Sequence, residues 1–201
     1  MNNNTIIILD FGSQYTQLIA RRVREIGVFS IVLPCDISIE KIQSMNPSGI
    51  ILSGGPETVT QSNTSKINKE LFNFQIPLLG ICYGMQTMAQ ELGGVVINSD
   101  KREFGHATIR RVEDSILFDG IDFSNNTLDV WMSHGDKVDQ LPDSFSAIAE
   151  SENCAVAAFQ NVEKSWFGLQ FHPEVTHTDQ GSKILSNFIY TVCKCEKNWQ
   201  T

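Results

Sequence analysis

A cysteine in one short stretch of the sequence has the neighbours that make cysteine a nucleophile. Pro77 to Ile81 is an apolar run, it leads into Gly80-Ile81-Cys82-Tyr83-Gly84, and a helical pattern from Met85 to Leu92 follows. Glycines on both sides of Cys82 permit the sharp strand-to-helix turn of a nucleophile elbow, with cysteine in place of serine. The start of the helix favours the thiolate, which is the reactive form. A buried core cysteine is the alternative.

A histidine and a carboxylate follow a second strand pattern. His172 directly follows the expected strand Phe167 to Phe171, and Pro173 separates His172 from Glu174. A cysteine nucleophile needs a base, and the base needs an acceptor that orients it. A turn at Pro173 lets Glu174 reach the imidazole, so we predict that Cys82, His172 and Glu174 form a catalytic triad. The alternative is a surface turn that contains a histidine.

A third motif, Ser53-Gly54-Gly55-Pro56, closes the apolar run Gly49 to Leu52. Two glycines let the backbone approach a ligand closely, and Pro56 stiffens the following chain. We predict that the N–H groups of Gly55 and Tyr83 form an oxyanion hole. A phosphate-binding loop is the competing interpretation, but no Gly-Lys-Ser/Thr follows.

The elements that position these motifs alternate in type through the first half. The expected strands are Thr5 to Leu9, Phe29 to Leu33, Gly49 to Leu52 and Pro77 to Ile81. The expected helices are Gln14 to Ile26, capped by Gly27, then Ile39 to Met45 and Lys66 to Phe74. This alternation predicts a parallel sheet with right-handed crossovers.

The second half is richer in strands. The expected strands are Val95 to Ile97, Ala107 to Val112, Leu128 to Met132, Ser146 to Ala149, Ala155 to Phe159 and Phe167 to Phe171, and a helix from Gly181 to Cys195 closes the chain. No long helix separates these strands, so some must pair antiparallel. We therefore predict an α/β fold: an open, mostly parallel central sheet flanked by helices, with an antiparallel portion, in one domain over residues 1–201.

Composition narrows the class of protein. The chain has 201 residues, of which 41% are hydrophobic, and 15 basic against 23 acidic residues give a net charge of −8. An acidic balance disfavours binding to nucleic acid or to an anionic membrane. The sequence shows no signal peptide and no apolar stretch long enough to span a membrane, which predicts a cytoplasmic protein. Five cysteines without a zinc-ligand pattern predict free thiols and no metal site.

These motifs, in this order, resemble a known family. Gly-Ile-Cys-Tyr-Gly-Met-Gln (80–86), Ser-Gly-Gly-Pro (53–56) and Phe-His-Pro-Glu (171–174) resemble the class I, triad-type glutamine amidotransferases, whose fold is flavodoxin-like. Longer strings resemble the amidotransferase portion of the GMP synthetase family in particular. They are Leu-Asp-Phe-Gly-Ser-Gln-Tyr-Thr-Gln (9–17), Trp-Met-Ser-His-Gly-Asp (131–136) and His-Pro-Glu-Val-Thr-His-Thr (172–178).

The resemblance implies a function for each motif. Cys82 would attack glutamine, His172 would act as base and Glu174 would orient it. Gln86 and a loop formed by Ser133, His134, Gly135 and Asp136 would bind the amino-acid end of glutamine. Ammonia would pass to a synthetase module that aminates XMP. ATP and Mg²⁺ would belong to that module, and no cofactor is expected in this domain.

The synthetase module is missing from these 201 residues. We expect an excised domain of a two-domain chain, and the alternative is a separate glutaminase subunit. Other functions stay open: another amidotransferase, a γ-glutamyl hydrolase, or a non-catalytic amidotransferase-like interaction module. The joint presence of Cys82, His172 and Glu174 argues against the non-catalytic module.

Overall fold

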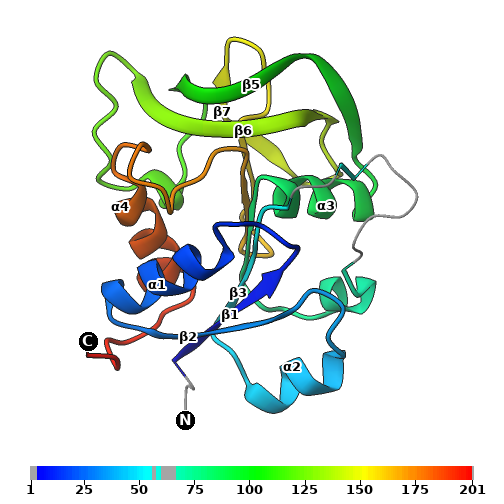
Figure 1. The fold of residues 1–201 in the computed structure, drawn as a ribbon, viewed down its shortest axis with the longest axis vertical. Helices are drawn as coiled ribbons and strands as arrows, with labels where there is room; N and C mark the ends of the chain where they lie inside the picture. The colour runs from blue at the N-terminus through cyan, green and yellow to red at the C-terminus, as the bar shows by residue number, and fades with distance from the viewer. Residues whose placement is uncertain (1–3, 56–57, 60–66, 201) are drawn as a thin grey trace.

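The computed structural model describes residues 4–55, 58–59 and 67–200, and it is built around one nine-stranded sheet (Figure 1). The strand order is β2-β1-β3-β4-β9-β8-β7-β5-β6. The strands are β1 (Thr5–Asp10), β2 (Phe29–Pro34), β3 (Gly49–Leu52), β4 (Leu78–Ile81), β5 (Val95–Arg111), β6 (Thr127–Gln140), β7 (Ser146–Ser151), β8 (Ala158–Asn161) and β9 (Trp166–Leu169). The predicted α/β class is confirmed.

The first five strands of this order pair in parallel, and the remaining pairs are antiparallel. Strand β1 lies between β2 and β3, with Ile7 beside Ile31 of β2 on one side and Ile50 of β3 on the other. Its apolar residues are buried on both faces, which explains why β1 is a continuous hydrophobic run.

Helices cover both faces of the parallel part (Figure 1). Ile6 and Ile8 of β1 point to a core shared with α1 (Thr16–Ile26) and α4 (Gly181–Ser186). Ile7 and Leu9 point to the opposite core, which contains α2 (Ile39–Met45) and α3 (Tyr83–Glu91). Successive side chains of β1 therefore point to opposite faces of the sheet and contribute to two separate cores.

The structure corrects several element boundaries. Val95 to Ile97 and Ala107 to Val112, expected as two strands, form the single strand β5, except that Val112 lies just beyond its end at Arg111. Strand β5 pairs with β6, with register shifts near Val95 and between Asn98 and Glu103. The charged residues between the two apolar runs conceal this continuity in the sequence.

Helical segments differ from expectation at their ends. Helix α1 begins at Thr16 and ends at Ile26, and Gly27 caps it in the expected left-handed conformation with φ of 112°. The segment Lys69–Asn73 is a 3₁₀ helix, η1, and the expected start at Lys66 lies outside the described residues. The closing helix continues past α4 as a π-helix, η3 (Asn187–Val192). A further 3₁₀ turn, η2, spans Ile116–Phe118.

In the described part of the chain, no helix is both long and apolar enough to cross a membrane. All five cysteines are free thiols, as expected from the sequence.

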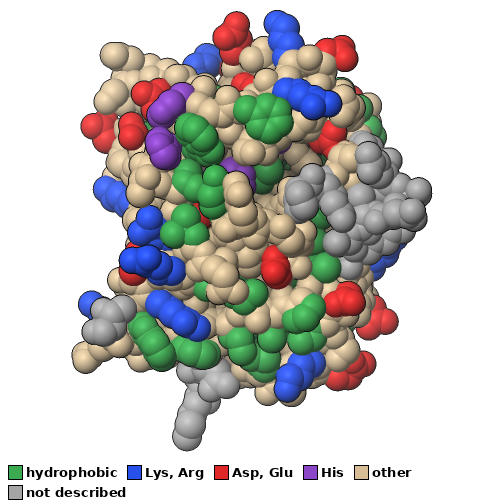
Figure 2. Space-filling view, in the orientation of Figure 1, with side chains coloured by type: hydrophobic (Ala, Val, Ile, Leu, Met, Phe, Trp, Pro, Cys, Tyr) green, Lys and Arg blue, Asp and Glu red, His purple; other side chains and the backbone are tan. Residues whose placement is uncertain are grey.

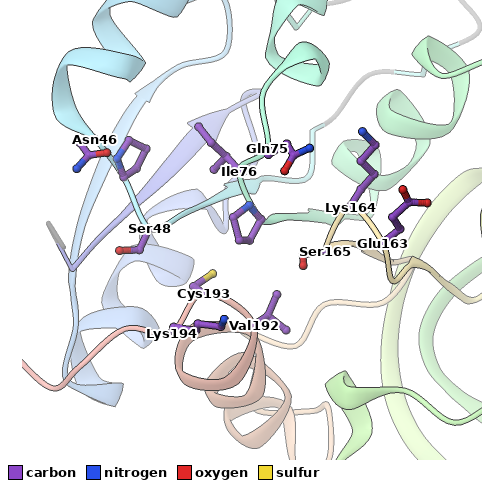
Figure 3. Close-up of a pocket in the computed structure, with 12 residues that line it drawn as sticks. Asn46, Ser48, Gln75, Ile76, Glu163, Lys164, Ser165, Val192, Cys193 and Lys194 are labelled. Atoms are coloured by element: carbon purple, nitrogen blue, oxygen red, sulfur yellow. The ribbon is translucent and has the colours of Figure 1, made fainter.

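The two ends of the parallel strands carry different groups. At the amino ends, Ser48, Pro77 and Ser165 precede β3, β4 and β9 and line a cavity of about 390 Å³ (Figure 3). Cys193 also lines this cavity, but burial raises its pKa well above the usual value, and its thiol stays protonated. The predicted chemical groups lie at the carboxyl ends, where α/β sheets bind ligands.

Candidate active site

Cys82 occupies the turn that joins β4 to α3. Its φ is +54° and its ψ is −109°, a conformation that residues other than glycine rarely adopt. A Cβ atom on Gly80 would lie 2.6 Å from the backbone nitrogen of Met85, and one on Gly84 would lie 2.3 Å from the carbonyl oxygen of Leu52. Both flanking glycines are therefore required, as the elbow motif predicts.

Cys82 is 4% exposed, and its sulfur has two polar neighbours: Ser133 on β6 and Gln170, which directly follows β9. Its thiol donates to the carbonyl oxygen of Ser133 at 3.4 Å, and the amide nitrogen of Gln170 donates to its sulfur at 3.6 Å. The elbow thus presents sulfur inside a polar, water-poor cleft.

His172 and Glu174 form a buried pair beside this cysteine. The Nδ1–H of His172 donates to Glu174 Oε1 at 2.6 Å, and the two residues are 3% and 1% exposed. Burial alone would lower the pKa of His172. The charge of Glu174 and hydrogen bonds with Cys82 and Glu174 outweigh burial and hold that pKa well above its usual value. The structure therefore joins His172 to Glu174 by a hydrogen bond, and Cys82 and His172 line one cavity.

Three hydrogen bonds hold the turn that carries this pair. Thr178 Oγ1 donates to the carbonyl oxygen of His172 at 2.6 Å, and the His172 N–H donates to the carbonyl oxygen of Trp131 on β6 at 3.0 Å. Arg22 on α1 donates through Nε to the carbonyl oxygen of Glu174 at 3.0 Å. The orientation of the imidazole is therefore set by packing on both the sheet and α1.

The loop after β3 lies against the same pair. Ser53 Oγ accepts from the Phe11 N–H at 3.0 Å and donates to the Gly54 carbonyl oxygen at 2.8 Å, which fixes the loop. A Cβ on Gly54 would lie 3.2 Å from His172 Cε1, and one on Gly55 would lie 2.9 Å from the carbonyl oxygen of Phe11. The two glycines therefore let the loop pack closely against His172 and the backbone of Phe11. The expectation for Pro56 falls outside the described residues.

The residues expected to bind glutamine gather around one cavity of about 400 Å³, together with Cys82. Those lining it from the prediction are Gly55, Tyr83, Gln86, Ser133, His134, Gly135 and Asp136. One expectation is wrong in detail: Ser133 to Asp136 do not form a loop but lie within strand β6. The apolar run ends at Met132, yet backbone pairing with β5 continues through these polar residues.

The sequence-based reasoning missed Gln170, although it lies two residues before His172 on the same strand pattern. Gln170 is fully buried, and its Oε1 accepts from Gln86 Nε2 at 3.1 Å. Gln86 Nε2 also donates to the carbonyl oxygen of Asp136 at 2.9 Å. An amide chain therefore links the cysteine sulfur to β6. The signal that could have identified Gln170 is its position two residues before the histidine, because residues i and i+2 of a strand point to the same face.

A second histidine and carboxylate pair supports β6. His134 Nε2 lies 3.0 Å from Glu103 Oε2, and its Nδ1 lies 2.7 Å from the carbonyl oxygen of Asp136. Burial would raise the pKa of Glu103, but hydrogen bonds from His134 and Ser151 lower it below its usual value. Glu103 is thus an anionic anchor for the strand that lines the cavity, and sequence-based reasoning did not find it.

Asp136 turns its carboxylate toward the cavity. Burial raises its pKa, while a hydrogen bond from Asn98 and the charges of His134 and Arg102 oppose that rise. Asn98 Nδ2 donates to Asp136 Oδ1 at 3.0 Å, and Thr58 donates to Oδ2. The cavity therefore offers a held carboxylate and, in Arg102, a cation.

An aromatic cluster borders the site on the outer face of the β5–β6 ribbon. The Trp131 ring lies 5.4 Å from the ring of His106 and 4.7 Å from that of His177, measured between centroids. Figure 2 shows histidine and hydrophobic side chains adjoining one another in the upper part of the molecule. The hydrogen bond from the His172 N–H to the carbonyl oxygen of Trp131 connects this cluster to the site.

Comparisons with known proteins indicate the family of the chain. The family model described as glutamine amidotransferase class-I matches residues 7–192. A protein named GMP synthase [glutamine-hydrolyzing] from Ruthia magnifica subsp. Calyptogena magnifica is 57% identical over 100% of this chain and 39% of its own length. One of the same name from Colwellia psychrerythraea is 52% identical over 99% of this chain and 39% of its own length.

Solved structures show the same fold. A GMP synthase subunit from Thermoplasma acidophilum has a TM-score of 0.81 at 30% identity and covers 94% of each chain. A glutamine amidotransferase from Thermotoga maritima has a TM-score of 0.75 at 20% identity, over 96% of this chain and 100% of that one. This chain spans about two fifths of the length of the named GMP synthases. The match over residues 7–192 and the identity with these relatives show that the chain belongs to the class-I glutamine amidotransferase family.

Proposed function

We propose that this chain hydrolyses glutamine to glutamate and ammonia, with Cys82 as the nucleophile. The observation that carries the proposal is the buried pair in which His172 donates to Glu174 at 2.6 Å, next to the cysteine of a strand-to-helix elbow. Each of the three side chains performs a step that the others cannot perform. Together they have the composition of a Cys-His-acid triad.

The first step activates the thiol. Cys82 passes its proton to His172 Nε2, and Glu174 stabilises the imidazolium that results. The raised pKa of His172 supports this step, because it favours the imidazolium form that the transfer produces. The positive end of α3 and the amide of Gln170 stabilise the thiolate.

The thiolate then attacks the side-chain carboxamide of glutamine. The new carbon–sulfur bond places negative charge on the amide oxygen, and we assign the N–H groups of Gly55 and Tyr83 to that oxyanion. His172 gives its proton to the amide nitrogen, the carbon–nitrogen bond breaks, and ammonia leaves. A γ-glutamyl thioester remains on Cys82. Water, deprotonated by the same imidazole, releases glutamate and regenerates the thiol.

The cavity of about 400 Å³ is the proposed binding site for the amino-acid end of glutamine. Glutamine is a zwitterion at its far end, and the cavity holds a carboxylate on Asp136 and a cation on Arg102. Gln86 and the backbone of Ser133 to Gly135 complete this binding site. Opposite charges in a partly buried cavity favour a ligand that carries both signs.

We further propose that the ammonia is consumed by a synthetase module that converts XMP to GMP in the cytoplasm, with ATP and Mg²⁺ held by that module. The names of the full-length relatives, GMP synthase [glutamine-hydrolyzing], support this proposal, since this chain matches only 39% of their length. The glutaminase half then needs no cofactor of its own.

Glutamate release tests the proposal. The purified chain is incubated with glutamine, alone and with the synthetase module of a relative, XMP and ATP, and glutamate is measured. We expect glutamate from the unaltered chain and none from Cys82→Ala. Asparagine, one methylene shorter, serves as the control substrate. Absence of glutamate under both conditions would contradict the proposed function.

A further inference from the structure

A chain of three hydrogen bonds, which we call the amide relay, connects strand β6 to the nucleophile. Gln86 Nε2 donates to the carbonyl oxygen of Asp136 at 2.9 Å and to Gln170 Oε1 at 3.1 Å. Gln170 Nε2 then donates to the sulfur of Cys82 at 3.6 Å. Gln86 is 3% exposed and Gln170 is fully buried, so bulk water does not compete for these bonds.

The direction of the relay follows from its first acceptor. A backbone carbonyl can only accept a hydrogen bond, so the Gln86 atom that faces the Asp136 carbonyl must be the amide nitrogen. The second hydrogen of that nitrogen is accepted by Gln170 Oε1. With its oxygen turned toward Gln86, Gln170 must present its own nitrogen to the sulfur. Turning over either amide would bring two donors or two acceptors face to face in a buried site, which costs free energy.

The Asp136 carbonyl that starts the relay is itself anchored. His134 Nδ1 lies 2.7 Å from this oxygen and must carry a proton, because the oxygen can only accept. His134 Nε2 lies 3.0 Å from Glu103 Oε2 on β5, and Ser151 Oγ on β7 donates to Glu103 Oε1 at 2.9 Å. Contacts with two neighbouring strands therefore fix the position from which Gln86 takes its orientation.

The sulfur has two contacts that favour opposite protonation states. The Cys82 thiol donates to the carbonyl oxygen of Ser133 at 3.4 Å, and this bond exists only while the thiol keeps its proton. The N–H of Gln170 instead binds more strongly when the sulfur becomes negative, because hydrogen bonds to charged acceptors are stronger than those to neutral ones. A fixed N–H at this position therefore favours the thiolate over the thiol.

We propose that Gln170 is a further catalytic residue, whose N–H stabilises negative charge on the Cys82 sulfur, and that Gln86 is a positioning residue that fixes the orientation of Gln170. The inference rests on the proposed glutaminase function. Negative charge reaches the sulfur twice, first when His172 takes the thiol proton. It returns when the carbon–sulfur bond of the thioester breaks, because the electron pair of that bond goes to the sulfur, which then takes a proton from His172. The relay thus gives Gln86 a second role besides the binding of glutamine.

Alkylation of Cys82 measures the charge on its sulfur without any substrate. The chain is treated with iodoacetamide at a series of pH values, and mass mapping of the Cys82 peptide gives the alkylation rate. Gln170→Met keeps an unbranched side chain but has no N–H. We expect it to move the midpoint of this pH profile upward by about one to two pH units and to lower kcat for glutamine by about tenfold or more.

Gln86 should act on the sulfur only through Gln170. Gln86→Met leaves Gln170 in place but removes the donor that orients it, so we expect a smaller shift in the same direction. In the double variant, Gln86→Met with Gln170→Met, the shift should equal that of Gln170→Met alone, because a positioning residue has no effect once the group that it positions is absent. Shifts that add would contradict the assignment of Gln86. None of these substitutions changes a charge.

Gln160 offers a matched control. This glutamine on β8 is 4% exposed, its Nε2 donates to the carbonyl oxygen of Asp114, and it is not among the described residues that line the proposed glutamine-binding site. Gln160→Met should lower the thermal stability and leave the midpoint of the alkylation profile and kcat unchanged. An equal shift in Gln160→Met and Gln170→Met would show that the relay is not the cause.

Two further results would overturn the inference while leaving the glutaminase function intact. One is glutamate formation by a folded Gln170→Met variant whose alkylation profile is unshifted. The other needs no variant to fold. In nitrogen–proton correlation spectra of the unaltered chain, the side-chain amide signals of Gln170 should move as Cys82 ionises, and constant signals across the alkylation midpoint would show that this N–H does not bind the sulfur. Absence of glutamate from the unaltered chain would instead contradict the proposed function itself.

Discussion

At the scale of single residues, the environment separates one cysteine from the other four. Burial raises the pKa of Cys154 to about 12 and also raises the pKa values of Cys193 and Cys195. Cys82 instead adjoins His172, whose pKa it helps to raise and whose Nδ1–H donates to Glu174. Reactivity therefore follows from neighbours and not from residue type, because only the thiolate is a good nucleophile.

This difference predicts selective covalent capture. A glutamine-like chloroketone should modify Cys82 and spare Cys35, Cys154, Cys193 and Cys195, because only Cys82 combines a base with a glutamine-sized cavity. Peptide mass mapping gives the modified position. Glutamine itself should slow the labelling by competition. Equal labelling of all five thiols would show that Cys82 is an ordinary cysteine.

The base should contribute more to the turnover of glutamine than the acid that orients it. His172→Ala removes the proton carrier of both half-reactions and should lower the turnover of glutamine by about 10²- to 10⁴-fold. Glu174→Gln keeps an oxygen near Nδ1 but loses the negative charge, so we expect a smaller loss. Steady-state glutamate release measures both effects, with circular dichroism to verify folding. Near-native turnover in both variants would remove the triad from the mechanism.

At the scale of elements, the contact between β4, α3 and β3 depends on glycine. Gly84→Ala places a methyl group against the backbone of Leu52, which cannot rotate away, so we expect a loss of about 3 kcal/mol or more in unfolding free energy. Gly135→Ala is the matched control, because its nearest neighbour is the flexible side chain of Arg102 at 3.6 Å.

Urea denaturation of the two glycine variants measures the difference. Gly135→Ala should remain within about 1 kcal/mol of the unaltered chain. Similar stability of the two variants would show that the elbow tolerates a side chain at Gly84, contrary to the geometry described above.

The sequence predicted those helices and strands in which the spacing of the apolar residues matches the spacing of the buried positions. Strand β1 and helix α2 fall where apolar periodicity places them, and Gly27 ends α1 as its residue type suggests. Local patterns also indicated all three members of the proposed triad, because each stands directly after a strand pattern or a proline turn. The carboxyl ends of parallel strands then bring them together.

What the sequence did not reveal depends on pairing between distant strands. The continuation of β6 through Ser133 to Asp136 follows from hydrogen bonding with β5, which the polar residue types conceal. Glu103 and Gln170 acquire their surroundings only when β5, β6 and β9 adjoin the site. Such contacts join positions 31 and 88 residues apart, and no local period encodes them.

At the scale of the whole molecule, the proposed division of labour predicts different behaviour with two nitrogen donors. In a protein that includes the synthetase module, Cys82→Ala should abolish the formation of GMP from glutamine. Ammonium salts at a pH that supplies free ammonia should still support it, because the proposed mechanism gives Cys82 no part in activating XMP with ATP. GMP formation with each donor is the measurement. Loss with both donors, in a folded variant, would contradict the scheme.

The backbone of Cys82 has a consequence for the stability of the entire domain. At φ of +54° and ψ of −109° the nucleophile is strained, and such positions cost on the order of 1–3 kcal/mol. Glycine would fit this turn without strain, so Cys82→Gly should unfold at a higher temperature than Cys82→Ala, although both lack the thiol. Thermal unfolding compares them, and a lower midpoint for glycine would show that the turn is relaxed. If the order holds, the reactive sulfur sits at a position where folding alone would favour glycine, and catalysis and thermostability compete for one residue.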